Sequence, residues 1–194
     1  EVIVVDDGST DGCPAFLHSS HPWVRSIRSP RNLGFAGAVN LGIAEAKGDL
    51  IALLNDDAEA DPGWLSALIR AAGRHPECGL FASRIMAWEP VDIIQEAGIL
   101  ILKNGGIRRH GEGASPRDGF LTPCYVFAAS GAAALYRRRV FERAGTFDEG
   151  FVGYFEDLDL AFRAQSLGER CLYVPDAFVR HLGGMSFQRQ RRVF

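Results

Sequence analysis

Two adjacent carboxylates, Asp6 and Asp7, are the first residues of this sequence that could do chemistry, and they follow the continuous apolar run 2–5. Such a run is typical of a strand that is buried on both faces of a parallel sheet. In open α/β sheets, ligands bind beyond the carboxyl ends of these strands. A carboxylate at that position can accept hydrogen bonds from a ribose hydroxyl or a base N–H. The alternative is an acidic Asx turn that binds no ligand.

A second acidic group, Asp56 and Asp57 after Asn55, follows the apolar run 50–54. Two adjacent carboxylates repel each other unless a cation joins them. Oxygen ligands on a short loop suit Mg²⁺ or Mn²⁺, particularly when diphosphate oxygens complete the coordination. The alternative is that these residues cap the next helix, but Asp61 is already placed for that role.

A third acidic group, Glu156, Asp157 and Asp159, lies at the start of a helix predicted over residues 156–167. Acidic side chains in the first turn of a helix interact favourably with the helix dipole, which is the structural explanation of this group. The catalytic explanation is a general base, because a carboxylate beside apolar rings is partly desolvated and accepts a proton more readily. The aromatic residues that precede the group are Phe147, Phe151, Tyr154 and Phe155.

A single histidine, His181, follows a strand predicted over residues 171–174. A histidine in such a position usually has a structural role or is merely exposed, but imidazole is also a common metal ligand. A helix and a strand lie between residues 157 and 181, which is enough chain to return His181 to the sheet edge that carries Asp57. A metal site shared with Asp57 therefore requires these two side chains to be neighbours.

The elements that must position these groups alternate between strands and helices, which predicts an α/β fold. Strands are predicted over residues 2–5, 23–27, 50–54, 126–129, 132–136 and 171–174. Helices are predicted over residues 32–47, from Asp61 and Pro62 onward, and over residues 138–144 and 156–167. The expected inner face of the second helix carries Trp64, Leu65, Leu68, Ile69 and Ala72. The glycine-rich segment 105–119 is predicted to be a mobile surface loop.

The composition is that of one soluble globular domain, because 47% of the 194 residues are hydrophobic and 23% are charged. A formal net charge of −3 gives no indication of a nucleic-acid partner, and the basic run 189–192 is explained as a solvated tail. The four cysteines include no CxxC pair, which excludes a zinc ribbon and fits a reducing compartment. No apolar run reaches the roughly 18 residues that a membrane-spanning helix needs.

Taken together, these groups resemble the motifs of family 2 glycosyltransferases, which have the GT-A fold. Val5–Gly12 resembles the nucleotide-binding loop, and Asn32–Asn40 resembles the next segment in the rhamnosyltransferase and galactofuranosyltransferase branch. Leu54–Ala58 stands at the family's DxD metal motif, and Phe155–Leu160 looks like the ED segment that carries the catalytic base. His181 stands where some members supply a histidine to the metal. The resemblance covers nearly the whole chain, with the motifs in order.

The resemblance implies a single GT-A domain over residues 1–194, with a mixed, mostly parallel sheet flanked by helices and a Rossmann-like nucleotide-binding half. We expect a chain truncated at both ends, because the family's first strand, before the Asp6 strand, is absent and relatives continue beyond Phe194. Asn55 replaces the first Asp of the DxD motif. This replacement makes Asp57 the principal metal ligand and places Asp56 with the donor ligands.

The activity implied by the resemblance is the inverting transfer of a sugar from a nucleoside diphosphate to a hydroxyl of a glycan or lipid-linked acceptor. Asp157 would be the general base, and Mn²⁺ or Mg²⁺ on Asp57 and His181 would stabilise the leaving diphosphate. The donor ligands would be Asp6, Asp7, Asn32 and Asp56. A dTDP- or UDP-sugar is expected, with rhamnose suggested by Asn32–Asn40. The expected location is the cytoplasm, and peripheral contact with the inner face of the membrane is left open.

Two other interpretations fit part of the sequence. A sugar nucleotidyltransferase would also use an α/β nucleotide-binding half with acidic metal ligands, but it gives no role to Asp157. A non-catalytic nucleotide-sugar-binding domain would use the same loops without turnover. A dinucleotide-binding Rossmann domain fits poorly, because no GxGxxG motif follows either strong strand.

Overall fold

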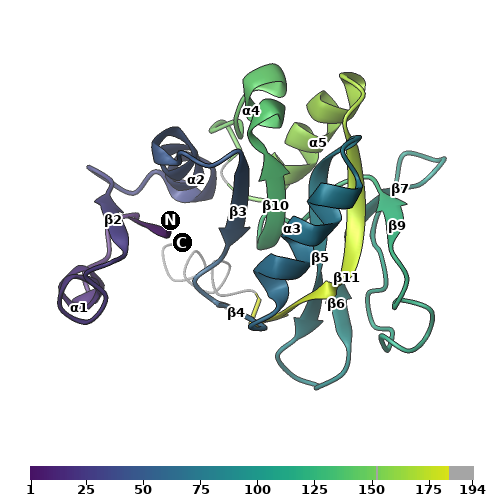
Figure 1. Cartoon of the computed structure of the whole chain (residues 1–194), viewed down its shortest axis with the longest axis horizontal. Helices are drawn as coiled ribbons and strands as arrows, with labels where there is room; N and C mark the ends of the chain where they lie inside the picture. The colour runs from purple at the N-terminus through teal and green to yellow at the C-terminus, as the bar shows by residue number, and fades with distance from the viewer. Residues whose placement is uncertain (152, 184–194) are drawn as a thin grey trace.

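A computed structural model describes residues 1–151 and 153–183 of the chain (Figure 1). The strands are β1 Ile3–Asp6, β2 Arg25–Arg28, β3 Leu50–Leu54, β4 Ala58–Ala60, β5 Cys78–Ala87, β6 Ile94–Glu96, β7 Ile99–Ile101, β8 Ile107–Arg109, β9 Cys124–Val126, β10 Ala133–Arg137 and β11 Arg170–His181. The helices are α1 Cys13–Ser20, α2 Gly34–Glu45, α3 Trp64–Arg74, α4 Arg138–Ala144 and α5 Glu156–Ser166. The predicted basic tail lies outside the described residues.

The central sheet of the described chain has seven strands, with β3, β10, β5, β11 and β4 side by side, β6 paired with β5, and β9 paired with β11. The mixed α/β class is confirmed. The share of parallel pairs is smaller than the sequence predicts, since only β5 and β11 pair in parallel in this sheet. The reason is that β10 lies between β3 and β5 and is antiparallel to both. Strands β3 and β5 therefore run in the same direction but do not pair with each other.

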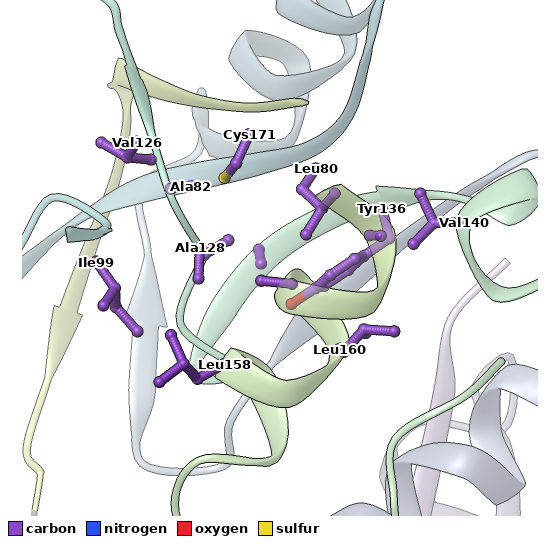
Figure 2. Close-up of a cluster of buried hydrophobic side chains, with 14 of the residues drawn as sticks. Leu80, Ala82, Ile99, Val126, Ala128, Tyr136, Val140, Leu158, Leu160 and Cys171 are labelled. Carbon is purple, nitrogen blue, oxygen red and sulfur yellow. The ribbon is translucent and has the colours of Figure 1, made fainter. Parts of the chain in front are cut away.

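Helices cover both faces of the central sheet. Helix α3 contributes Trp64 and Leu68 to a core with Phe81 and Leu135 on one face. On the other face, α2, α4 and α5 pack against the alternate residues of the same strands. Figure 2 shows this second core, where the fully buried Tyr136 of β10 lies among Leu158, Leu160 and Val140. The period of two along β5 and β10 thus divides the apolar side chains between the two layers.

Helix α3 corrects two details of the sequence prediction. It begins at Trp64 because the Asp61 carboxylate accepts a hydrogen bond from Gly63 N (2.7 Å) in a turn that precedes the helix. Leu65 and Ile69 are not on the inner face, since 45% and 47% of their surfaces are exposed. Each lies one position past an inward-facing residue, and one residue corresponds to about 100° around a helix.

The loop of Asp6 and Asp7 lies at the end of β1, which pairs in parallel with β2 in a separate small sheet. Helix α2 packs against β1, as Figure 1 shows on the side of the molecule away from β9. The predicted loop 105–119 contains a strand, β8, which forms a hairpin with β7. None of the described helices is both long and apolar enough to cross a membrane.

Candidate donor and metal site

The second acidic loop and the end of β11 meet at one edge of the central sheet. Strand β4 pairs with the last residues of β11, and this register sets Ala58 opposite His181. Asp57 Oδ1 lies 3.0 Å from His181 Nε2, and Leu182 N donates a hydrogen bond to the Asp57 carbonyl (3.0 Å). The two side chains are 15% and 14% exposed. The predicted proximity of His181 and Asp57 is confirmed.

The far side of the imidazole is held as well, because His181 Nδ1 lies 3.0 Å from Gln95 Oε1. Both ring nitrogens therefore lie next to an oxygen atom, and the Asp57 side of the imidazole is placed for either a hydrogen bond or a shared cation. Histidine ligands of metals commonly use their second nitrogen in this way. Two ligands at about 2.1 Å from an octahedral cation are about 3 Å apart, which matches the Asp57–His181 distance. This donor set fits Mg²⁺ or Mn²⁺.

The neighbouring carboxylate of Asp56 is not part of this pair. Asp56 is exposed in the turn between β3 and β4. Within the turn, Asn55 N donates to the Ala132 carbonyl (2.9 Å), which fixes the loop against the start of β10. Asp56 is therefore free to contact a ligand from solvent.

The Asp6 carboxylate organises the first acidic loop from inside. Asp6 is 5% exposed, its Oδ1 accepts a hydrogen bond from Ser9 N (2.8 Å), and its Oδ2 lies 3.5 Å from Arg28 Nη1. The hydrogen bonds from Ser9, helped by the Arg28 charge, lower the pKa of Asp6 below its ordinary value. Arg28 also donates to the Ser9 carbonyl (3.0 Å). Asp6 thus stays ionised and holds the turn.

Asp7 and Asn32 link the first loop to the start of α2. The Asp7 carboxylate accepts hydrogen bonds from Ser29 Oγ (2.8 Å), Leu33 N (2.8 Å) and Gly34 N (3.0 Å). Asn32 donates to the Asp7 carbonyl (3.2 Å) and accepts a bond from Gly34 N (3.2 Å). A carboxylate at a helix N-terminus is favoured by the helix dipole. These bonds explain structurally why the two motifs occur together.

Asp157 lies at the start of α5, where Tyr154 and Phe155 have left-handed φ values of 66° and 73°. Such backbone strain in non-glycine residues is concentrated at functional sites. The Asp157 carboxylate accepts hydrogen bonds from Gly131 N (3.1 Å) and Leu158 N (2.8 Å). Burial raises the pKa of Asp157, against the lowering effect of these two bonds.

The surroundings of Asp157 differ from the predicted aromatic cluster. Tyr154 and Phe155 are exposed, and Phe147 is buried in the core instead. Glu156 is 7% exposed, and its pKa is raised chiefly by burial. Asp159 faces elsewhere, as expected: it accepts two hydrogen bonds from Arg163, at 2.9 and 2.7 Å.

A buried carboxyl group that sequence reasoning missed, Glu96, interacts with Asp157. Glu96 is 6% exposed on β6, and its Oε1 has no hydrogen-bond partner within the described chain. Its Oε2 lies 3.4 Å from Arg109 Nε. Burial, and next the charge of Asp157, raises the pKa of Glu96 to about 8. A lone acid in the apolar stretch 93–101 is the signal that could have found it.

The sheet with acidic loops at its strand ends is a GT-A-type architecture, which two solved structures share. The crystal structure of GalNAc-T7 with UDP, GalNAc and Mn²⁺ has a TM-score of 0.72 and 19% identity over 93% of this chain and 37% of its own. The mannosyltransferase PcManGT from Pyrobaculum calidifontis in complex with GDP-Man and Mn²⁺ has a TM-score of 0.67 and 21% identity over 99% of this chain and 51% of its own. At these identities the likeness concerns the fold.

The family follows from sequence. The family model for Glycosyl transferase family 2 matches residues 1–145, and the chain belongs to this family. A second model, Glycosyltransferase like family 2, matches residues 121–192. The chain is 32% identical to the N-acetylglucosaminyl-diphospho-decaprenol L-rhamnosyltransferase of Mycobacterium tuberculosis (strain ATCC 25618 / H37Rv). That match covers 93% of this chain, which spans 66% of the relative's length.

Proposed function

We propose that this chain carries the donor site and the general base of an inverting glycosyltransferase, which moves a sugar from a nucleoside diphosphate to a saccharide hydroxyl. The observation that carries the proposal is the Asp57–His181 pair, 3.0 Å apart at the sheet edge and backed by Gln95. The pair would hold Mn²⁺ or Mg²⁺, which supplies charge stabilisation for the departing diphosphate. The loop of Asp6 and Asp7 lies at the end of a strand, where α/β folds bind nucleotides.

Asp157 would accept the proton of the acceptor hydroxyl. Each of its carboxylate oxygens accepts one backbone N–H, so each keeps a lone pair for a further hydrogen bond. The two N–H donors fix the orientation of the carboxylate, and its raised pKa makes it a stronger base than an exposed aspartate. A single displacement inverts the anomeric carbon and requires no nucleophilic side chain.

For substrates, we propose a UDP- or dTDP-sugar as donor and a lipid-diphosphate-linked saccharide as acceptor. The support is the name of the M. tuberculosis relative, which is a rhamnosyltransferase acting on N-acetylglucosaminyl-diphospho-decaprenol. dTDP-rhamnose is therefore the first donor to try.

The test begins with calorimetry of UDP and dTDP, with and without Mn²⁺. We expect Asp57→Ala to abolish the Mn²⁺-dependent part of nucleotide binding, whereas Asp56→Ala, which removes an adjacent exposed carboxylate, keeps it. Metal-stimulated binding that survives in Asp57→Ala would refute the site.

The second measurement is release of nucleoside diphosphate during transfer. Asp157→Asn should bind the donor normally but lower kcat by about a hundredfold or more, the usual contribution of a general base. Donor binding without any turnover in the wild-type protein would favour the non-catalytic interpretation, and release of pyrophosphate would favour a nucleotidyltransferase.

A further inference from the structure

A pocket of about 340 Å³ opens on the Gln95 side of His181. The residues of its lining that matter here are Trp88 and Glu89 after β5, Gln95 on β6, Glu112, His181 and Leu182. It lies where the β5–β6 turn and the segment after β8 approach the end of β11. His181 is therefore shared between this pocket and the pair that it forms with Asp57.

The lining combines an aromatic surface with hydrogen-bonding groups. Trp88 is 40% exposed, and its indole N–H has no partner within the described chain. Gln95 uses its oxygen for His181, which leaves its amide hydrogens without a hydrogen-bond acceptor in the described part of the structure. Carboxylates of Glu89 and Glu112 provide acceptors. An aromatic face beside a few placed polar groups suits a ligand with one apolar face and a rim of hydroxyls, which is a pyranose.

The charge of the pocket disfavours a diphosphate. Two lining residues are acidic, and neither lysine nor arginine is part of the described lining. The nearby Arg109 is committed to carboxylates, with Nε 3.4 Å from Glu96 and Nη1 3.6 Å from Glu112. The two carboxylates repel an anion in the part of the pocket away from His181, whereas a neutral saccharide finds acceptors for its hydroxyls there.

The pocket shares one residue with the proposed metal-binding pair. His181 forms part of its lining and also faces Asp57. Glu112 of the lining lies 3.6 Å from Arg109 Nη1, and Arg109 Nε lies 3.4 Å from Glu96 Oε2. A saccharide in the pocket therefore lies against the same histidine that faces Asp57.

We propose that this pocket binds the sugar residue of the acceptor that receives the transferred sugar, with Trp88 as its stacking platform. The inference rests on the proposed function, but its test does not depend on turnover. The chain offers a matched control in Trp23, which is 70% exposed and packs against His21 far from the pocket.

The binding test follows the indole N–H signals of Trp23, Trp64 and Trp88 by NMR, assigned by single Trp→Phe variants. The probes are methyl glycosides of N-acetylglucosamine, glucose, galactose and rhamnose, and separately UDP with the diamagnetic Mg²⁺. We expect at least one glycoside to shift the Trp88 signal and leave Trp23 and Trp64 in place. No shift of Trp88 with any glycoside overturns the proposal, while binding of UDP with Mg²⁺ shows that the donor site stands.

The kinetic test compares Trp88→Ala with Trp23→Ala. For Trp88→Ala we expect the acceptor KM to rise about tenfold or more, from loss of the aromatic contact, with donor hydrolysis in the absence of acceptor unchanged. Trp23→Ala should change neither quantity. An unchanged acceptor KM in Trp88→Ala refutes the pocket assignment, whereas absence of any sugar transfer by the wild-type protein refutes the proposed function instead.

Discussion

The buried Glu96 carboxyl predicts a specific dependence of stability on pH. Its pKa in the folded protein is about 8, against an ordinary value of 4.5, because burial and the charge of Asp157 disfavour the carboxylate. Arg109 acts in the opposite direction, and Glu112 acts with Asp157. The informative substitution is Glu96→Gln, which keeps the shape of the neutral side chain and removes its titration.

The sign follows from proton binding. Between pH 4.5 and about 8 the folded protein keeps a proton on Glu96 that the unfolded chain has released, so stability falls as pH rises. The contribution is complete below pH 4.5 and is lost through about pH 8. At about 1.4 kcal/mol per pKa unit, the change over this range is roughly 3 to 5 kcal/mol.

The assay is urea unfolding of the wild-type protein and Glu96→Gln at intervals between about pH 5 and 8. The wild-type free energy of unfolding should fall across this range relative to that of Glu96→Gln. Asp157 adds a dependence of the same sign, since its pKa is also raised, so the difference between the two proteins is the quantity to measure. Asp56→Asn is the control, because it removes an exposed carboxylate that is not among the charges acting on Glu96 and should leave the wild-type slope. Parallel profiles for the wild-type protein and Glu96→Gln would refute the reasoning.

Two further substitutions separate structural from functional carboxylates. Asp7→Asn replaces an acceptor of three hydrogen bonds at the start of α2, so both the free energy of unfolding and the free energy of nucleotide binding should fall by about 1 to 3 kcal/mol; unchanged affinity by calorimetry would contradict a role near the donor. Asp159→Asn breaks the pair with Arg163 and should lower thermal stability by an amount equivalent to about 0.5 to 1 kcal/mol, with kcat unchanged; an inactive Asp159→Asn together with an active Asp157→Asn would move the base to Asp159.

Local patterns in the sequence predict the strands and helices that carry the acidic groups, but not the central strand. Strand β5 is buried almost throughout, yet Ser83 and Arg84 interrupt its apolar run, so no simple period marks it. The predicted strand 171–174 continues to His181, because a shift in register between Val174 and Phe178 accommodates Pro175 without ending the pairing with β5. Long-range pairing, which the local sequence does not encode, decides both cases.

The candidate site was likewise predictable from the sequence only in part. The distance between Asp57 and His181 confirms the expectation that the chain returns His181 to the sheet edge that carries Asp57. That expectation required only a helix and a strand between residues 157 and 181. Gln95 and Glu96 were not expected, because β6 reaches the site only through its pairing with β5. The expectation that aromatic rings bury Asp157 was wrong. Tyr154 and Phe155 have left-handed backbone conformations just before α5, and both of their side chains are exposed.

The Asp57–His181 pair joins residues 124 positions apart, and the β4–β11 pairing alone brings them to the same edge. During synthesis, Asp57 leaves the ribosome long before His181, so a partly made chain has only one side of the proposed cation site. A cation that needs both ligands binds only molecules in which β11 has docked, and it stabilises that population by mass action. Supply of the divalent ion would therefore govern how many newly made molecules remain fully assembled, in addition to how fast each of them works.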